Sequence, residues 1–562
     1  MDSDGPLLAV TERGLTVRYR GRNLYSPVDP VGSAERRARA VPIADSTLYL
    51  LPSPLLFYGV DVLLSSLPEN SHLLCVETDQ RLMRLSLETA PKRLVEDPRL
   101  TYVRSDAADG VLVTLRALGL GRFKRCREVI LNGGRSIEAQ WYARVFGLVQ
   151  FEIQSYWRNR LTLVHMSHLW VKNLFLNLPN LVGALDLQSL KTELPIVVAG
   201  AGESLEESIP LLREVRSRVY LLAVDTAILS LHAGGIEPDG IVALEAQFAN
   251  LADFIGSDQS KSAGVVDLSS CPACIRRFEP GRRFFFLSQF AELALFDRLK
   301  AFGLLPTLVP PLGSVGIAGL YCAISMTKSP ILFSGLDFAF RPGKIHARGS
   351  PTHRRHLRTA NRIDPNAELL SGLAHPFRRV TGKGGGELWT SPGLSSYLQS
   401  LSLLASGTNR FRDLGKLGLV SGTPTLTDRN EILKLVRAED TRPNGTARPL
   451  SRACNDVGLH SPFVPQKILA FLQEERKLHA RLVAAGTRLL ETRKAVGSKL
   501  ADPAEKQFRE ALKSVEYVRL HFPDRPGESR LSESFIKRAL EASDTCVRWI
   551  DRAGTLVETQ RE

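Results

Sequence analysis

The chain has 562 residues, of which 44% are hydrophobic and 23% charged, as is typical of a globular protein with more than one domain. Lysine and arginine number 73 against 59 acidic residues, so the formal charge of +14 favours an anionic partner without naming it. The N-terminus lacks a signal-peptide pattern and no apolar run is long enough to span a bilayer. We therefore expect a cytoplasmic protein without stable membrane insertion.

Residues 1–135 are expected to form a small α/β domain. Residues 15–19 alternate as a strand, and residues 48–54 and 72–79 have the pattern of strands on either side of a helical segment. The strand at 72–79 contains Glu77, which is a candidate ribose-binding acid, but no G-x-G-x-x-G motif is present there. An accessory or degenerate nucleotide-binding domain is the preferred interpretation.

Residues 136–190 are predicted to be a helical connector, because apolar residues recur there at mixed spacing among basic and amide residues. A helix packed between domains is the preferred interpretation. The alternative is that Arg158 and Arg160 line an anionic pocket.

Residues 191–425 are predicted to be a Rossmann-like domain with a parallel sheet. A short apolar run at 196–199 leads directly into Gly200-Ala201-Gly202, where two glycines permit a tight turn and leave room for a ligand. Ser204 and Glu207 then have the spacing of a capping box. Phosphate is commonly held where such a loop meets a helix N-terminus.

The proline at position 210 leaves a second interpretation open, in which the regular helix begins only at Ser208. Further strands are predicted at 219–224 and 241–244, with a short helix between them. In an open α/β sheet, ligands bind at the carboxyl ends of the strands. The polar residues predicted at this edge are Gly202, Ser204, Asp225, Thr226, Glu245 and Gln247. The spacing alone leaves a nucleotide-type ligand and a plain tight turn equally open.

The α/β alternation continues beyond this motif, with a strand at 330–334 followed by Asp337. Residues 341–363 then hold seven arginines and lysines and three histidines, with no acid. We interpret them as a loop that clamps a phosphate or carboxylate; a solvated basic loop is the alternative. Nucleic acid is disfavoured because no aromatic residue stands among the basic ones to stack on bases.

The seven cysteines are scattered except for Cys271-Pro272-Ala273-Cys274. This pair has the spacing of a redox site or of half a zinc site. No second pair or suitably spaced histidine is visible, so two free thiols are preferred.

Residues 426–464 are predicted to be a linker and residues 465–562 a helical domain, with helices at about 465–500, 502–522 and 530–554. This bundle has a structural, oligomeric or partner-binding use, and a homo-oligomer formed through it is one expectation.

Five stretches, taken in their order along the chain, resemble the motility-associated factor (Maf) proteins, which are flagellin glycosyltransferases of bacteria. The stretches are VVAGAGESLEE, AVDTAILSLHAGGIEPDGIVALEAQ, PPLGSVGIAGLYCA, ILFSGLDFAF with KIHARGS, and GGGELWTSPGLSSYLQSL. The resemblance covers about residues 1–425. This chain departs from the family at Glu203, where proline is more frequent, and at Glu245, where aspartate is usual.

The resemblance implies a sialyltransferase-like central domain that moves a nonulosonic acid, of the pseudaminic, legionaminic or sialic type, from a CMP-activated donor to Ser or Thr of flagellin. It thereby implies a role in flagellar assembly and motility. His346 is the first candidate for the base or acid, with Asp337 orienting it or acting as the base. The implied donor-binding residues are Gly200, Gly202, Glu203, Ser204, Asp225, Thr226, Glu245, Gln247, Ser314, Arg348 and Thr390. No cofactor or metal ligand is assigned, although a divalent metal stays open.

Two alternatives remain. The same central domain is shared with archaeal enzymes that pyrophosphorylate a hydroxymethylpterin, and then Asp225, Glu245 and Asp337 would hold magnesium for ATP. The other alternative is a non-catalytic scaffold whose helical tail binds flagellin.

Overall fold

The computed structural model describes residues 5–105, 107–363, 377–436, 461–496, 502–522 and 531–560. The chain divides into two compact units, residues 1–163 and 164–562, and helix α6 (Ala139–Asn177) contributes to both. Most of the predicted linker, residues 437–460, lies outside the described residues. The domain boundaries proposed within the second unit stay predictions. Among the described residues, no helix combines the length and the hydropathy needed to cross a membrane.

The first unit is built on a parallel four-stranded sheet in the order β6-β5-β4-β7. Its central strands are buried along their whole length, as their aliphatic sequences predict. The strands are β4 (Thr47–Pro52), β5 (His72–Glu77), β6 (Leu100–Arg104) and β7 (Arg125–Glu128). The helices are α1 (Pro30–Arg39), α2 (Val60–Ser66), α3 (Gln80–Thr89), α4 (Lys92–Val95) and α5 (Ala108–Leu118). A small antiparallel sheet precedes them, made of β1 (Leu7–Thr11), β2 (Gly14–Tyr19) and β3 (Arg22–Asn23).

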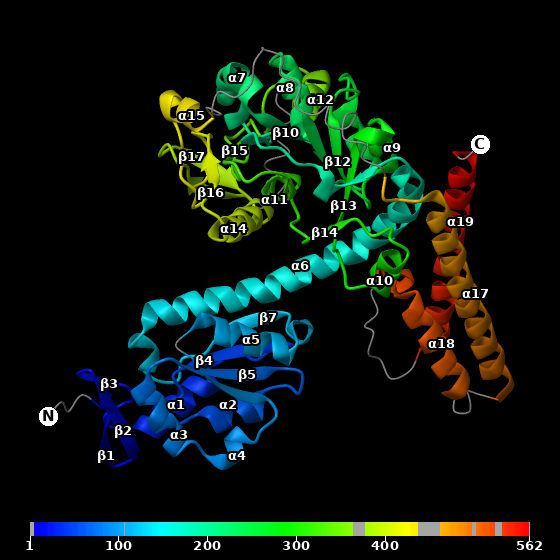
Figure 1. Ribbon diagram of the computed structural model, residues 1–562. Helices are drawn as coiled ribbons and strands as arrows, with labels where there is room; N and C mark the ends of the chain where they lie inside the picture. The colour runs from blue at the N-terminus through cyan, green and yellow to red at the C-terminus, as the bar shows by residue number, and fades with distance from the viewer. Residues whose placement is uncertain are drawn as a thin grey trace. The chain divides into compact units, whose positions relative to one another are not determined.

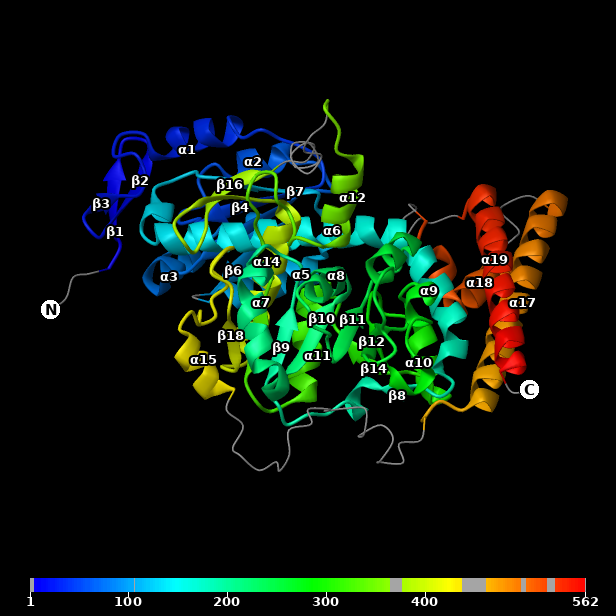
Figure 2. The same cartoon turned by 90° about the horizontal axis from the view of Figure 1, so that it is seen from above.

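The second unit is built on a nine-stranded sheet in which every described neighbour is parallel. The order is β14-β13-β12-β11-β10-β9-β15-β18, with β8 beside β13, and Figure 2 shows β9 to β12 side by side. The strands are β8 (Leu185–Asp186), β9 (Ile196–Ala199), β10 (Tyr220–Val224), β11 (Gly240–Ala243), β12 (Ala263–Asp267), β13 (Arg283–Ser288), β14 (Thr307–Val309), β15 (Ile331–Ser334) and β18 (Phe411–Asp413). The predicted parallel sheet is thus confirmed.

Helices cover both faces of this sheet because alternate residues of each strand point to opposite sides. Ile196 and Val198 of β9 pack with α11 (Val315–Met326) and α14 (Pro392–Ser406), whereas Val197 and Ala199 pack with α7 (Ser204–Val215) and α8 (Ile228–Ala233). Figure 1 shows these helix pairs on opposite sides of the strands. The remaining elements named below are α9 (Pro272–Ile275), α10 (Ala294–Ala301), α12 (Pro351–Thr359), α15 (Arg429–Leu435), β16 (Arg378–Thr381) and β17 (Glu387–Thr390).

The strand order reverses between β9 and β15. From β9 the chain proceeds through β10, β11, β12 and β13 toward β14, whereas β15 and β18 lie on the other side of β9. The loops that follow β9 and β15 therefore begin at neighbouring strand ends. Such a reversal is where open α/β sheets bind their ligands.

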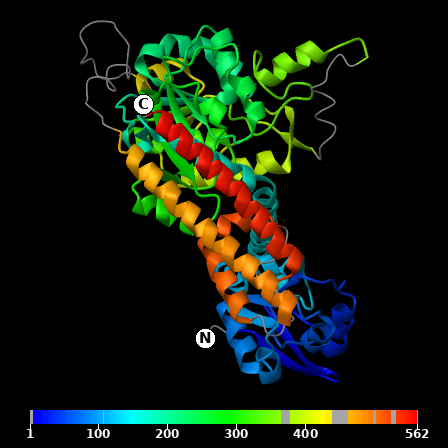
Figure 3. The ribbon, with the colours of Figure 1, turned by 90° about the vertical axis from the view of Figure 1, so that its right-hand side faces the viewer.

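The C-terminal helices are α17 (Pro465–Val496), α18 (Asp502–Ser514) and α19 (Glu533–Thr559), and Figure 3 shows α17 and α19 running side by side. They share one apolar core with α10 and the sheet. A buried polar chain also joins them: Glu475 of α17 accepts hydrogen bonds from Arg298 of α10 and, at 2.7 Å, from the Tyr517 hydroxyl. His479 contacts the Tyr517 hydroxyl and the Ser543 hydroxyl at 2.8 Å each. The predicted helical domain therefore packs as part of the second unit.

The basic segment 341–363 differs from its prediction as a loop. Residues 351–359 form helix α12, because Ser350 accepts a hydrogen bond from the His353 N–H and Pro351 occupies the first helical position. The N-terminal signal was present in the sequence, but glycines and prolines around it favoured a loop.

Candidate functional site

The loops after β9 and β15 pack back to back at the strand-order reversal. The Gly200 N–H donates to the Ser334 carbonyl and the Gly202 N–H to the Gly335 carbonyl, both at 2.8 Å. A Cβ on Gly200 would overlap the Gly335 carbonyl oxygen, and one on Gly202 would lie 2.6 Å from Asp337 Oδ2. The absence of side chains on the two glycines thus makes room for the loop after β15. The sequence analysis had predicted that this room would serve a ligand.

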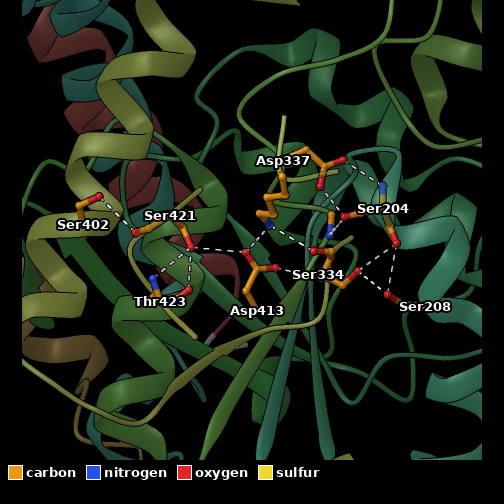
Figure 4. Close-up of polar contacts among 11 residues, drawn as sticks. Ser204, Ser208, Ser334, Asp337, Ser402, Asp413, Ser421 and Thr423 are labelled. Atoms are coloured by element: carbon orange, nitrogen blue, oxygen red, sulfur yellow. Dashed lines mark hydrogen bonds and ion pairs between the residues drawn. The ribbon is translucent and has the colours of Figure 1, made fainter. Parts of the chain in front are cut away.

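Asp337 occupies the N-terminus of α7. Its Oδ2 accepts from the Ser204 N–H at 2.9 Å and its Oδ1 from the Ser204 hydroxyl, which in turn accepts from the Gly335 N–H at 2.9 Å (Figure 4). The predicted capping box is wrong, because Glu203 is the N-cap residue and no side chain of its own segment caps the helix. Pro210 lies inside α7, which begins at Ser204 and not at Ser208. The carboxylate of Asp337 takes the place at which a phosphate was expected.

Burial raises the pKa of Asp337 to about 6, against the lowering effect of its hydrogen bonds from Ser204. A second buried acid, Asp413 of β18, lies in the same network and pairs with Lys383. Its Oδ1 accepts from the Gly415 N–H at 2.9 Å, and the Ser421 hydroxyl lies 3.4 Å from its Oδ2 (Figure 4). This network fastens β15, β18 and α7 to one another.

A pocket of about 350 Å³ opens beside this network. It is lined by residues that follow β9, β10, β11 and β15 and by the start of α11. The predicted site residues on its wall are Gly200, Gly202, Asp225, Thr226, Glu245, Ser314, Asp337 and His346. The structure thus brings most of the predicted residues into one cavity.

Two carboxyl groups on the pocket wall have few partners. Asp225, 2% exposed, is hydrogen-bonded within the described residues by Thr226 alone, through the backbone N–H at 2.8 Å and the hydroxyl. Burial raises the pKa of Asp225 well above its usual value, and the nearby charges of Asp253 and Glu245 raise it further. Burial also raises the pKa of Glu245, and that of Asp253 to about 6. These acids repel one another when ionised, so a cation or a hydrogen-bond donor on a ligand would stabilise them.

The opposite wall is formed by the N-terminus of α11. Gly313, Ser314, Val315 and Gly316 line the pocket, and the Ser314 side chain makes no capping hydrogen bond. The first N–H groups of a helix have no intrahelical partner, and the helix dipole is positive there. No lysine or arginine is among the residues that line the pocket. The N-terminus of α11 is therefore the part of the pocket wall that most favours an anion.

Apolar and aromatic side chains that the sequence analysis did not single out complete the wall. They are Phe338, Phe340, Ile345, Leu394 and Tyr397, together with the polar Asn250. Burial raises the pKa of Tyr397, and the charge of Glu245 raises it further. Tyr397 lies within one of the stretches that resemble Maf proteins, but nothing in its spacing marked it.

The remaining predicted site residues do not line the pocket. The Ser204 hydroxyl is taken by Asp337, the Thr390 hydroxyl donates to the Phe338 carbonyl at 2.8 Å, and Gln247 is exposed. Glu203 pairs with Arg341 and, at 2.9 Å, with Lys344. These four residues therefore lie outside the pocket wall in this conformation.

The first three lysine or arginine residues of segment 341–363 form ion pairs with an acidic residue of α7 and with its N-cap residue. Lys344 also contacts Glu206 at 3.0 Å, and the Arg348 side chain, 77% exposed, lies 3.7 Å from the same carboxylate. Arg341, Lys344 and Arg348 are thus engaged with acids of the protein, and the phosphate clamp stays a prediction.

No group of three or more histidine, cysteine, aspartate or glutamate side chains is placed to hold a metal ion within the described ranges. Asp225 and Glu245 form only a pair. Magnesium is commonly bound by one or two carboxylates together with substrate phosphates, so a pair suits a metal that arrives with its substrate.

Residues 172–343 match the model of a protein family described as 6-hydroxymethylpterin diphosphokinase MptE-like. The central domain is MptE-like. A solved structure, that of the MAf glycosyltransferase from Magnetospirillum magneticum AMB-1, aligns with a TM-score of 0.51 and 15% identity over 99% of this chain and 93% of that one. The MptE-like domain therefore sits in a chain whose fold matches this structure over nearly its whole length, which confirms the predicted fold.

Two proteins of Treponema pallidum (strain Nichols), both described as uncharacterized, are similar in sequence. One is 27% identical over 556 residues, covering 97% of this chain and 95% of that protein. The other is 32% identical over 90 residues, covering 16% of this chain and 43% of that protein. Residues 172–343 contain all of the pocket wall except Ile345, His346, Leu394 and Tyr397, and α14 supplies the last two.

Proposed function

We propose that this chain is a Maf-type glycosyltransferase that moves a nonulosonic acid from a CMP-activated donor to Ser or Thr of flagellin. The observation that carries the proposal is the 350 Å³ pocket at the strand-order reversal of the MptE-like sheet. The match of the whole chain to a MAf glycosyltransferase fold supports this activity class. The choice of sugar and acceptor rests on the stretches that resemble Maf proteins.

The donor phosphate would lie at the N-terminus of α11, because this is the part of the wall that favours an anion. Phe338, Phe340 and Tyr397 would contact the nucleoside. In the transfer step the acceptor hydroxyl attacks the anomeric carbon, the bond from that carbon to the phosphate oxygen breaks, and CMP leaves with the electron pair. A base takes the acceptor proton.

His346 is our candidate base, since it lines the pocket. Asp225 and Glu245 would position hydroxyl groups of the sugar or acceptor, with their raised pKa values making protonated forms available as donors. Asp337 would position the loop that follows β15, because Ser204 occupies both of its oxygens.

The first test is thermal stabilisation of the full chain by CMP, a CMP-linked nonulosonic acid, ATP and GTP, each with and without magnesium. A ligand that binds only the folded state raises the melting midpoint by mass action. We expect a shift with the CMP species that Asp225→Asn reduces. Asp297→Asn, an exposed acid of α10 outside the pocket, is the matched control. Release of CMP in the presence of flagellin then measures transfer.

A second candidate is a diphosphokinase that uses ATP and magnesium. The acidic wall favours it, because a pocket with three carboxyl groups and no lysine or arginine suits a phosphate ligand that carries its own divalent cation. A shift confined to ATP with magnesium, together with formation of AMP, would replace the first proposal with this one. No shift with any ligand would favour the scaffold, which a flagellin pull-down would test.

A further inference from the structure

Two thiols lie behind the acidic wall of the pocket and take no part in the proposed reaction. Cys271 directly precedes α9 and Cys274 lies within it, and each is 2% exposed. The Cys274 N–H donates to the Cys271 carbonyl at 3.0 Å, so a single turn of the chain carries both side chains. Both thiols are free and have the C-x-x-C spacing of redox-active pairs.

Cys271 is the more nucleophilic of the two. The thiol of Cys274 and the backbone N–H groups of Cys274 and Ala273 donate to its sulfur, and the guanidinium of Arg276 lies nearby. These groups lower the pKa of Cys271 below its usual value, while its donor role and burial raise the pKa of Cys274. The lowered pKa favours the thiolate form of Cys271, and the thiolate is the form that attacks disulfides.

A second pocket, of about 270 Å³, gives access to Cys271. It lies between the end of α6, the residues after β11, α9 and α19. Leu169, Leu176 and Leu556 supply much of its apolar wall, and no acid lines it. Its three cations, Lys172, Arg276 and Arg552, form no ion pair in the part of the chain that the structure describes. The pocket is thus suited to a small anion with an apolar or sulfur-containing body.

We infer that Cys271 and Cys274 form a reversible thiol–disulfide pair whose co-reactant is a small anionic disulfide bound in this second pocket. The Cys271 thiolate attacks one sulfur of the disulfide and releases its other half as a thiolate, which takes up a proton. Cys274 then loses its proton and attacks the sulfur of Cys271 in the mixed disulfide, and the second half leaves and is protonated. In sum, two protein thiols and one disulfide give one protein disulfide and two small thiols.

The position of the pair connects it to the candidate site. The Cys271 N–H donates to the Glu245 carbonyl at 2.9 Å, and the charges of Asp225 and Asp253 act on Cys274. The thiol–disulfide inference stands on the cysteines and their pocket, so it does not depend on the proposed transfer reaction.

The test equilibrates the full chain with mixtures of glutathione and glutathione disulfide, followed by acid quenching, alkylation and peptide mass spectrometry. We expect loss of two hydrogens from the peptide that holds Cys271 and Cys274, rising with the disulfide fraction and reversed by glutathione. Cys274→Ser should retain glutathione on Cys271, whereas Cys271→Ser should leave Cys274 unmodified. This wild-type measurement needs no variant to fold, and absence of the internal disulfide at every ratio would overturn the inference.

Cys126 is the matched control, because it is more exposed than Cys271 while burial raises its pKa to about 12. If exposure alone governed the reaction, Cys126 would take up glutathione as fast as Cys271, and that result would also overturn the inference. Alkylation of Cys271 by iodoacetamide should rise with pH through a midpoint well below that of Cys126. In Cys274→Ala that midpoint should move upward, since the side-chain hydrogen-bond donor is lost.

The class of co-reactant is tested with Lys172→Gln and Arg552→Gln. Each should slow the reaction with glutathione disulfide by roughly fivefold, which is about 1 kcal/mol for one surface charge. The neutral bis(2-hydroxyethyl) disulfide should react unchanged. Arg488→Gln, an exposed arginine of α17 outside the pocket, should alter neither rate. Equal slowing with both disulfides would show that the cations do not select an anion.

Discussion

This chain contains two parallel sheets whose strand order reverses beside a central strand. The buried acids near the two reversals differ in their hydrogen bonds. In the first unit the reversal lies between β4 and β7, and in the second between β9 and β15. Each places a buried acid at the end of a neighbouring strand: Glu77 is the last residue of β5, and Asp225 directly follows β10. The difference is in how many donors each acid has.

Glu77 is fully satisfied by its own unit. Its Oε2 accepts from the Ser53 hydroxyl at 2.5 Å, and its Oε1 accepts from the Thr78 N–H, the Asp79 N–H and the Tyr142 hydroxyl at 2.9–3.1 Å. Asn132 adds a hydrogen bond to the Ser53 carbonyl at 2.8 Å. The first sheet therefore uses its acid as a structural acceptor, whereas Asp225 retains bonding capacity toward a cavity. An acid at the end of a strand does not by itself mark a ligand site; its remaining hydrogen-bonding capacity does.

The largest effect is expected from Glu77→Ala. It leaves buried donors of Ser53 and Tyr142 and two N–H groups without their acceptor, at roughly 1–3 kcal/mol each before water relaxes the loss. We expect a total of about 4 kcal/mol, seen by calorimetry as a drop of roughly 10 °C in the transition of the first unit. Hydrogen exchange in β4 and β5 should rise with it. Unchanged stability would contradict the conclusion that Glu77 is a structural hydrogen-bond acceptor of the first unit.

The second prediction concerns pH. Burial raises the pKa of Glu77 to about 7 from an ordinary value near 4.5. The folded unit then holds a proton that the unfolded chain has lost, so the contribution to stability is complete below pH 4.5 and disappears as the pH rises to 7. The loss amounts to about 3 kcal/mol by linkage. Glu77→Gln should remove this slope, and an equal slope in the variant would assign it to another group.

A stability comparison within the second unit is the third prediction. Asp267, at the end of β12, is as buried as Asp225 but accepts from the Ser269 N–H and hydroxyl and from the Ser288 N–H, at 2.6–2.8 Å. Asp267→Asn should cost about 2 kcal/mol because a charged acceptor is lost. Asp225→Asn should leave stability at pH 8 unchanged or raise it by about 1 kcal/mol, since a poorly solvated acid is removed. Urea unfolding measures both, and equal losses would remove the distinction between them.

The smallest effect is expected from Ser204→Ala. The variant removes the hydroxyl between Asp337 and the Gly335 N–H while keeping the Ser204 N–H, so we expect a loss of about 1–2 kcal/mol. Because this hydroxyl does not line the pocket, ligand affinity should fall far less than in Asp225→Asn. An equal fall in both would place Ser204 at the ligand.

Short-range signals were sufficient to predict much of this fold and part of the site. Asp225, Thr226 and Glu245 meet at one edge because each lies within two residues of the end of a parallel strand, and that geometry is set by the strands themselves. Asp337 was predicted to lie at the same edge, but its role depends on β15 lying beside β9, so that it caps a helix 133 residues away. Local spacing instead favoured a capping box from Ser204 and Glu207.

The pairing of Glu203 with Arg341 was likewise hidden, since 138 residues separate them. The sequence marked the arginines as free to hold a ligand because no acid stands among them. Tyr397 reaches the pocket only through the packing of α14 against the sheet, a tertiary contact that no residue pattern encodes.

A buried hydrogen-bond network joins Arg298, Glu475, Tyr517, His479 and Ser543. This network limits how the C-terminal helices can be gained or lost in evolution. A stop codon before α17 would leave the Arg298 guanidinium without its carboxylate and would uncover the apolar core shared with α10. An ancestor or descendant lacking the C-terminal helices would therefore need compensating substitutions on α10. Gain or loss of this segment is a coupled change in two places, unlike the addition of a detachable tail.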